Sequence, residues 1–161
     1  MSKMTREEYK DLACLIGARF PEAFPEAPRP LAIGIDKAIV KAFPGLSKTK
    51  TRLFLRRWCN TVSYKVALST DGRRFDPDGL VVGAVTAAER EHALKELAAY
   101  FYERRNNPDH LVWRRARRLW DLVEHAGIDG QVRDIARQLA DADRMDGKTV
   151  HWPLHAKPAA D

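Results

Sequence analysis

The segment from Lys48 to Asn60 constrains the fold most, because its charged and apolar residues separate onto two faces of a helix. At about 100° per residue, Lys48, Arg52 and Arg56 fall within about 80° of one another. The apolar side of the same helix is made up of Thr51, Phe54, Leu55, Trp58 and Cys59. A helix here packs one side against a core and presents three cations on the next side.

Positive charge is concentrated around this segment. From Leu46 to Arg74 the chain has eight Lys and Arg residues and a single acid, Asp71, which gives +7, whereas the whole chain carries +6. Such a window is the electrostatic footprint of a polyanion site, and nucleic acid is the commonest polyanion. A plain solvated helix face is the alternative. However, solvated faces usually mix both signs, and no acid occurs from Lys48 to Thr70.

Capping and turn residues predict further helices. Thr5 and Glu8 form a capping box for a helix that Pro21 stops, and Ser47 is the natural N-cap of the basic helix. Other helices are expected over residues 34–43, 86–105, 109–125 and 129–145. Tyr64 is expected just past the end of the basic helix. A turn at residues 76–79 joins two short strands, 73–75 and 80–82. The predicted fold class is mainly α with a small β-hairpin.

Composition excludes several classes of protein. No apolar run is long enough to span a membrane, and the first residues lack a signal-peptide core, so we expect a cytoplasmic protein. Cys14 and Cys59 both sit in helix-like apolar patterns and are expected to be small buried side chains. The five histidines show no spacing typical of a metal site, and we expect no metal and no cofactor.

The start of the basic helix suggests a phosphate site. Its unpaired backbone N–H groups and positive dipole end would act together with the side chains of Ser47, Lys48 and Thr49. Tyr64 has two interpretations. A tyrosine near a helix end commonly packs in or beside the core, but its ring can also support a base and its hydroxyl a phosphate.

Several motifs, in order, resemble the FinO/ProQ family of bacterial RNA chaperones. They are RPLAIGI at 29–35, LSKTKTRLFLRRW at 46–58, Tyr64, RRFDPDGLVVG at 73–83 and TAAEREHALKEL at 86–97. The resemblance covers about residues 6–97. It implies a compact FinO/ProQ-like domain, which we place over residues 1–97. Residues 98–161 lie outside the matched motifs, and their helical pattern predicts a C-terminal extension with a flexible tail. The resemblance further implies that a concave face binds the base of a terminator hairpin and its single-stranded 3′ tail.

The resemblance also implies site residues. Tyr64 and Arg74 would form a pocket for the RNA 3′ end, helped by the helix start, and Arg52 and Arg56 would contact the hairpin backbone. The predicted RNA-binding set is Ser47, Lys48, Thr49, Arg52, Arg56, Tyr64, Arg73 and Arg74. Secondary RNA contacts are expected at Lys50, Arg57, Lys65, Lys95, Arg114, Arg115, Arg117 and Arg118. Two family cations are replaced, by Ala32 and Leu94, and Arg57 and Arg73 are extra cations that could compensate.

The extension has its own basic segment, VWRRARRLW at residues 112–120. Trp113 and Trp120 share one face, so this helix either docks through its tryptophans, adds a second RNA contact through its arginines, or binds a partner. The final residues, which include HWPLH, carry no functional interpretation.

The leading functional hypothesis is a non-enzymatic RNA chaperone that stabilises small regulatory RNAs and promotes RNA–RNA pairing. The sequence does not determine its oligomeric state, although a monomer is favoured. The first alternative is a DNA-binding regulator that inserts the helix at 48–60 into a major groove, although the preceding segment does not look like a helix-turn-helix unit. The second alternative is a phosphoryl-transfer enzyme. Asp76 and Asp78 lack the third carboxylate or histidine that such a centre requires.

Overall fold

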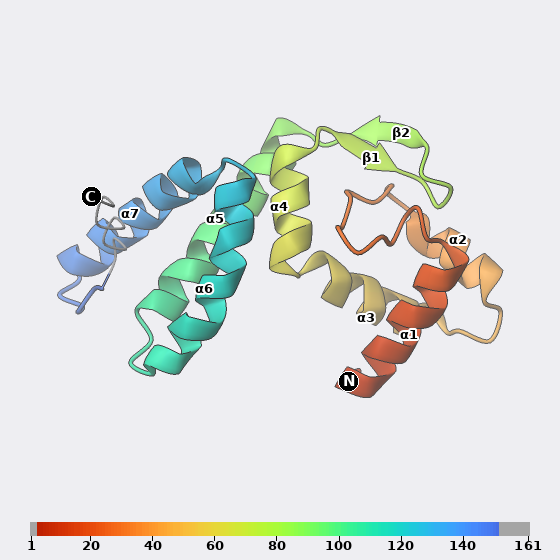
Figure 1. Cartoon of the computed structure of the whole chain (residues 1–161), viewed down its shortest axis with the longest axis horizontal. Helices are drawn as coiled ribbons and strands as arrows, with labels where there is room; N and C mark the ends of the chain where they lie inside the picture. Colours follow the sequence, from red (N-terminus) through yellow and green to blue (C-terminus); the bar gives the residue numbers. More distant parts are fainter. Residues whose placement is uncertain (1–2, 152–161) are drawn as a thin grey trace. The chain divides into compact units, whose positions relative to one another are not determined.

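The structure is a computed structural model that describes residues 3–151, so the expected flexible tail lies outside the described residues. The contacts divide the chain into two compact units, residues 1–87 (unit 1) and 88–161 (unit 2). Unit 1 contains α1 (Arg6–Arg19), α2 (Ile35–Ala42), α3 (Lys48–Cys59), α4 (Val62–Thr70), β1 (Arg73–Phe75) and β2 (Val81–Ala84) (Figure 1). Unit 2 contains α5 (Ala87–Arg105, less its first residue), α6 (His110–His125) and α7 (Asp129–Met145). The boundary expected at residue 97 falls inside α5, whereas the units divide at its start.

The predicted fold class is confirmed: the described chain is mostly helical with one two-stranded antiparallel hairpin. The helix starts follow from the predicted caps. Thr5 and Glu8 exchange both hydrogen bonds of a capping box, at 3.1 and 2.8 Å. The Ser47 hydroxyl accepts from the backbone N–H of Lys50 at 3.2 Å. Each cap satisfies a backbone donor that the helix itself leaves unpaired.

Helix α4 was not expected, and Tyr64 lies in its first turn rather than past a helix end. Only Asn60 and Thr61 separate the two helices, and Thr61 caps the start of the second. Its hydroxyl donates to the Trp58 carbonyl at 2.8 Å, and its oxygen accepts from the backbone N–H of Tyr64 at 3.3 Å. Because the break contains neither glycine nor proline, the sequence carries no strong signal for it.

The buried side of α3 lies where the periodicity placed it. Thr51 and Phe54 are fully buried. Phe54 lies 5.8 Å from Phe24 and 6.1 Å from Trp58 between ring centroids, and Phe24 and Trp58 are 5.2 Å apart. Such aromatic pairs contribute about 0.5–1.5 kcal/mol each beyond the area that they bury. This cluster fixes α3 in unit 1, so its opposite side must face solvent.

The hairpin is extended by a third stretch of chain. β1 pairs with β2, with a register irregularity between Arg74 and Phe75. Leu31 forms a parallel bridge to Phe75, and the backbone N–H of Ala32 donates to the Phe75 carbonyl at 2.8 Å. The loop between the strands is the predicted turn, in which the Asp76 carboxylate accepts two backbone N–H groups at 2.9 and 2.8 Å. The segment before α2 therefore lies directly against β1.

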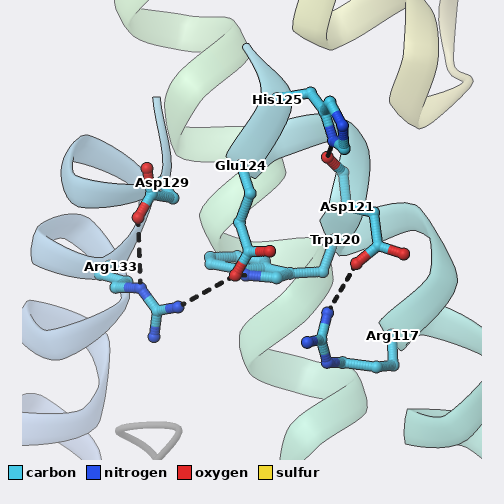
Figure 2. A network of polar contacts seen from close by, with 7 residues as sticks. All are labelled: Arg117, Trp120, Asp121, Glu124, His125, Asp129 and Arg133. Carbon is cyan, nitrogen blue, oxygen red and sulfur yellow. Dashed lines mark hydrogen bonds and ion pairs between the residues drawn. The ribbon is translucent and has the colours of Figure 1, made fainter. Parts of the chain in front are cut away.

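Unit 2 is held together by its own aromatic and polar contacts. The Trp120 ring of α6 lies 4.9 Å from that of Phe101 of α5, perpendicular to it. The Trp120 indole N–H donates to Glu124 at 2.8 Å, and the Arg133 guanidinium of α7 lies 4.8 Å from the Trp120 ring centroid. Figure 2 shows Arg133 between Glu124 and Asp129. Trp120 thus packs within unit 2, between α5 and α7.

Three further observations concern the described residues. Cys14 is exposed, so the expectation that both cysteines are buried is wrong for Cys14: its position in α1 falls outside the face that packs on the core. Within residues 3–151, no helix has the length and apolar character needed to cross a membrane. In the same part of the chain, no three His, Cys, Asp or Glu side chains gather where they could hold a metal ion.

Candidate nucleic-acid interface

The outer side of α3 carries a row of three exposed cations. Lys48, Arg52 and Arg56 are all exposed and occur once per turn, which corresponds to a run of about 12 Å along the helix. Within residues 3–151, none of the three forms an ion pair with a carboxylate. The geometry agrees with the orientation expected from the helical periodicity. Three uncompensated charges in a row attract an anion with regularly spaced charges.

A groove between α2 and α3 adds two cations that the sequence analysis missed. It has a volume of about 340 Å³. We call it the α2–α3 groove, and its lining residues are Asp36, Lys37, Val40, Lys41, Lys48 and Arg52. Four cations therefore face a single acid. Lys37 and Lys41 repeat the four-residue spacing of Lys48 and Arg52, and that repeat within an expected helix was the available signal.

The side chains of the predicted phosphate site at the start of α3 line two different cavities. Ser47 and Thr49 line a different cavity, of about 420 Å³, together with Glu8 and Asp11 of α1. The Lys50 ammonium lies 3.6 Å from the Glu8 carboxylate in an ion pair. A backbone hydrogen bond from Thr5 and the charge of Lys50 lower the pKa of Glu8, which keeps this carboxylate anionic.

Lys48 instead lines the α2–α3 groove. The structure thus separates Lys48 from Ser47 and Thr49. Two carboxylates beside the second cavity disfavour a phosphate there.

Tyr64 and Arg74 converge on one residue, Leu31. The Tyr64 hydroxyl accepts from the backbone N–H of Leu31 at 3.0 Å, and the Arg74 guanidinium donates to the Leu31 carbonyl at 2.8 Å. Tyr64 is 5% exposed and Arg74 is 9% exposed. Burial, together with the neighbouring Cys59, raises the pKa of Tyr64 to about 12, so its hydroxyl is protonated at neutral pH. We call this arrangement the Leu31 clamp.

Beside the clamp, Arg74 also lines a small surface cavity. The cavity has a volume of about 300 Å³. Its lining residues are Ala32, Ile33, Arg74, Val82, Gly83 and Ala84. Ile33 is 86% exposed, so the cavity has apolar walls and one cationic group. Tyr64 does not line it, and the burial of its ring leaves no face for a base to stack on. Tyr64 is therefore connected to Arg74 through their shared hydrogen bonds to Leu31.

The two cations that were expected to compensate for Ala32 have partners within the protein. Arg57 donates to the Thr5 carbonyl at 3.2 Å and lies 4.5 Å from the Tyr9 ring centroid. Arg73 is exposed and forms an ion pair with Asp71 at 3.1 Å. Burial alone would raise the pKa of Asp71, but hydrogen bonds from Arg73 lower it. These two arginines already use part of their hydrogen-bonding capacity within the protein.

Besides Lys50 and Arg57, the other six secondary positions fall into three groups. Lys95 and Arg117 form ion pairs with Glu91 at 2.6 Å and with Asp121 at 2.8 Å. Lys65 is half-buried on α4. The remaining arginines of α6, which are exposed and form no ion pair within residues 3–151, are Arg114, Arg115 and Arg118. Unit 2 therefore has its own, smaller set of available cations.

Together, these features define a small, mainly helical domain with a cationic surface suited to a polyanion. The chain belongs to the ProQ/FINO family, whose model matches residues 7–110. That match includes α1 to α5 and both strands, and therefore the α2–α3 groove and the Leu31 clamp.

Relatives and solved structures agree with the family. A protein of Idiomarina loihiensis that is named RNA chaperone ProQ is 32% identical to this chain over 100 residues. The match covers 59% of this chain and 47% of that protein. The matched part thus spans about half the length of this curated relative. A FinO-like RNA chaperone from Neisseria meningitidis MC58 is 26% identical with a TM-score of 0.50, covering 65% of this chain and 97% of the other. A ProQ homolog from Legionella pneumophila, 23% identical with a TM-score of 0.51 over 68% and 93% of the two chains, shares the fold.

Proposed function

We propose that this protein is a non-enzymatic RNA chaperone that binds intrinsic-terminator hairpins with a single-stranded 3′ tail. It stabilises small regulatory RNAs and promotes their pairing with other RNAs. The proposal depends most on one observation: a chain of the ProQ/FINO family presents an uncompensated row of cations on α3. The curated relative and the Neisseria structure are both named as RNA chaperones.

The α3 row is the proposed contact to the hairpin backbone. Lys48, Arg52 and Arg56 would each approach a phosphate and release condensed counterions, which is the main source of affinity for a polyanion. Because these contacts do not read bases, they bind duplex RNA largely without regard to sequence. Specificity for a terminator must then come from the tail and its end.

The cavity beside Arg74 is the proposed site for the 3′ end of the tail. A guanidinium binds phosphate and hydroxyl oxygens with several N–H donors, and apolar walls such as Ile33 can cover a sugar or base. Tyr64 is a positioning residue in this proposal, because its hydroxyl holds Leu31 next to Arg74. Occupation of the cavity would shield the RNA end from exonucleases.

The same charges account for the proposed pairing activity. Two RNA strands repel each other through their phosphates, and a surface that neutralises part of that charge lowers the barrier to their association. The exposed arginines of α6 would add weaker contacts of the same kind. No bound cofactor is needed for any of these steps.

A comparison of four ligands tests the proposal. The full chain is titrated with a terminator hairpin that ends in a 3′ U tail, with the same RNA ending in a 3′ phosphate, with a tailless hairpin, and with duplex DNA of equal length. We expect the tightest binding to the tailed RNA with a free 3′ hydroxyl. Equal affinity for all four ligands would overturn the 3′-end mechanism, and a preference for the DNA would favour the DNA-binding regulator instead.

A further inference from the structure

The α2–α3 groove differs from ordinary basic surface in having cations on both walls. Lys37 and Lys41 stand on α2, and Lys48 and Arg52 stand on α3. All four side chains are exposed, and none forms an ion pair with a carboxylate within residues 3–151. Each pair has a spacing of four residues, so its members are neighbours on one helix face.

Such an arrangement lowers the stability of the folded protein unless a bound anion compensates the repulsion between the cations. Like charges at a spacing of four destabilise a helix, and here two such pairs also face each other across the groove. The single acid in the lining, Asp36, lies in the first turn of α2, where it complements the helix dipole. It leaves a charge of about +3 in the groove. A solvated surface without a ligand would gain stability from alternating signs.

We propose that the α2–α3 groove binds the phosphodiester backbone of one RNA strand, with Lys37 and Lys41 contacting it from one side and Lys48 and Arg52 from the other. The inference deepens the proposed function and rests on it. A groove of about 340 Å³ can hold the backbone of a single strand, either one strand at the hairpin base or the tail.

The groove also supplies positive charge in place of the lysine that the family resemblance places at Ala32. Arg57 and Arg73, the obvious substitutes, already have partners within the protein. Lys37 and Lys41 have none among the described residues, and they supply two charges directly beside the α3 row. The cationic surface is thus extended toward α2 rather than restored at position 32.

The first test compares two variants of equal charge in the full chain. Lys37→Gln/Lys41→Gln removes one wall of the groove. Lys3→Gln/Lys10→Gln removes two exposed lysines that do not line it. Affinity for the tailed terminator hairpin is measured across a range of salt concentrations. We expect the groove variant to bind about tenfold more weakly, with a salt slope lower by about 1.4–1.8, and the control to change less than about twofold. Equal changes in both variants would overturn the proposal.

A combination of variants tests whether both walls hold the same phosphates. Lys48→Gln/Arg52→Gln is measured alone and together with Lys37→Gln/Lys41→Gln. Shared phosphates predict that the quadruple variant loses clearly less affinity than the product of the two separate losses. Independent, multiplicative losses would mean two separate surfaces and would contradict a single groove.

Two further measurements distinguish weaker binding from unfolding and identify the part of the RNA that lies in the groove. Unchanged or slightly raised melting temperatures are expected, because each substitution removes like-charge repulsion, so weaker binding cannot be attributed to unfolding. A tailless hairpin and an isolated U-rich strand show which part of the RNA supplies the backbone. Only the ligand that occupies the groove should bind the groove variant more weakly than the wild type. The wild-type titration reports the proposed function by itself. If the groove variant kept the full tail-specific binding of the wild type, the proposed role of the groove would be refuted, whereas the proposed function would remain.

Discussion

The two units differ in net charge and in how many of their cations form ion pairs. Unit 1 contains fifteen Lys and Arg against nine Asp and Glu, a net charge of +6, whereas unit 2 contains thirteen of each and is neutral. In unit 2, arginines are paired with nearby acids: Arg133 with Glu124 and Asp129, and Arg137 with Asp134 at 2.9 Å. On α3 of unit 1, Lys50 pairs with Glu8, but Lys48, Arg52 and Arg56 have no such partners among the described residues.

The difference shows that the number of arginines does not by itself mark a polyanion site. α6 carries four arginines, but it also contains Asp121 and Glu124, and Arg117 is already paired with Asp121 (Figure 2). Charge that is paired within the protein stabilises the fold a little, whereas unpaired charge is available to a ligand. The predictions below test this distinction, beginning with a residue that both supports the fold and lines a cavity.

The largest effect is expected at Arg74, which both supports the fold and lines the cavity. Arg74→Ala should weaken binding of the tailed hairpin about 100-fold, since truncation of a buried charged contact costs about 2–5 kcal/mol. It should also lower the melting temperature, because the Leu31 carbonyl loses its donor. Affinity is measured well below the melting temperature. A lower melting temperature with unchanged affinity would show that Arg74 is structural only.

The second prediction compares matched charge removals in the two units. Arg52→Gln/Arg56→Gln should weaken RNA binding about tenfold and lower the salt slope by about 1.4–1.8, with no loss of stability. Arg133→Gln/Arg137→Gln should leave affinity within about twofold but reduce the free energy of unfolding by up to about 1 kcal/mol, because it removes ion pairs. Parallel titrations and thermal melts check both. An inverted result would refute the distinction between the units.

The sequence predicted what depends on local chemistry. Caps such as Thr5 and Ser47 act over three residues, and the two faces of α3 follow from helical geometry alone. Helix α4 was missed because only Asn60 and Thr61 separate it from α3, and the Thr61 hydroxyl forms hydrogen bonds to both helices. Local signals fail where one side chain serves two elements.

The site was less predictable, because it depends on contacts between distant segments. The Leu31 clamp joins residues 33 and 43 positions apart in the sequence, so neither the burial of Tyr64 nor its hydrogen bond could be derived from its neighbours. Lys37 and Lys41 become significant only when α2 packs beside α3. The division of Ser47 from Lys48 likewise requires the position of α1.

The third prediction isolates the positioning role of Tyr64. Tyr64→Phe keeps the buried ring and removes the hydroxyl, which leaves the Leu31 N–H without its acceptor. We expect a loss of about 1–3 kcal/mol in the free energy of unfolding and only about a threefold loss of RNA affinity. Denaturant unfolding and RNA titration measure the two quantities. A loss of affinity as large as that of Arg74→Ala would mean that the hydroxyl contacts RNA directly.

Alkaline titration checks the same residue in the unchanged protein. The pKa of Tyr64 is raised to about 12 by burial, whereas an unfolded tyrosine ionises near 10. A raised folded-state pKa means that its contribution to stability is fully present below pH 10 and is lost as the pH rises through 12. Comparison of wild type with Tyr64→Phe assigns the phenolate absorbance. Ionisation of Tyr64 near pH 10 would contradict its burial in the clamp.

The smallest effect is expected from the exposed arginines of α6. Arg114→Gln/Arg118→Gln should weaken binding about twofold and lower the salt slope by less than about 1, since unit 2 has no net charge to reinforce these two cations. The matched control, Arg137→Gln/Arg144→Gln, removes two arginines that form ion pairs with Asp134 and Asp141, and it should leave the slope unchanged. If the α6 variant lowered the slope as much as the α3 variant, unit 2 would be an equal part of the RNA surface. Local exposure, rather than the net charge of a unit, would then decide where the polyanion binds.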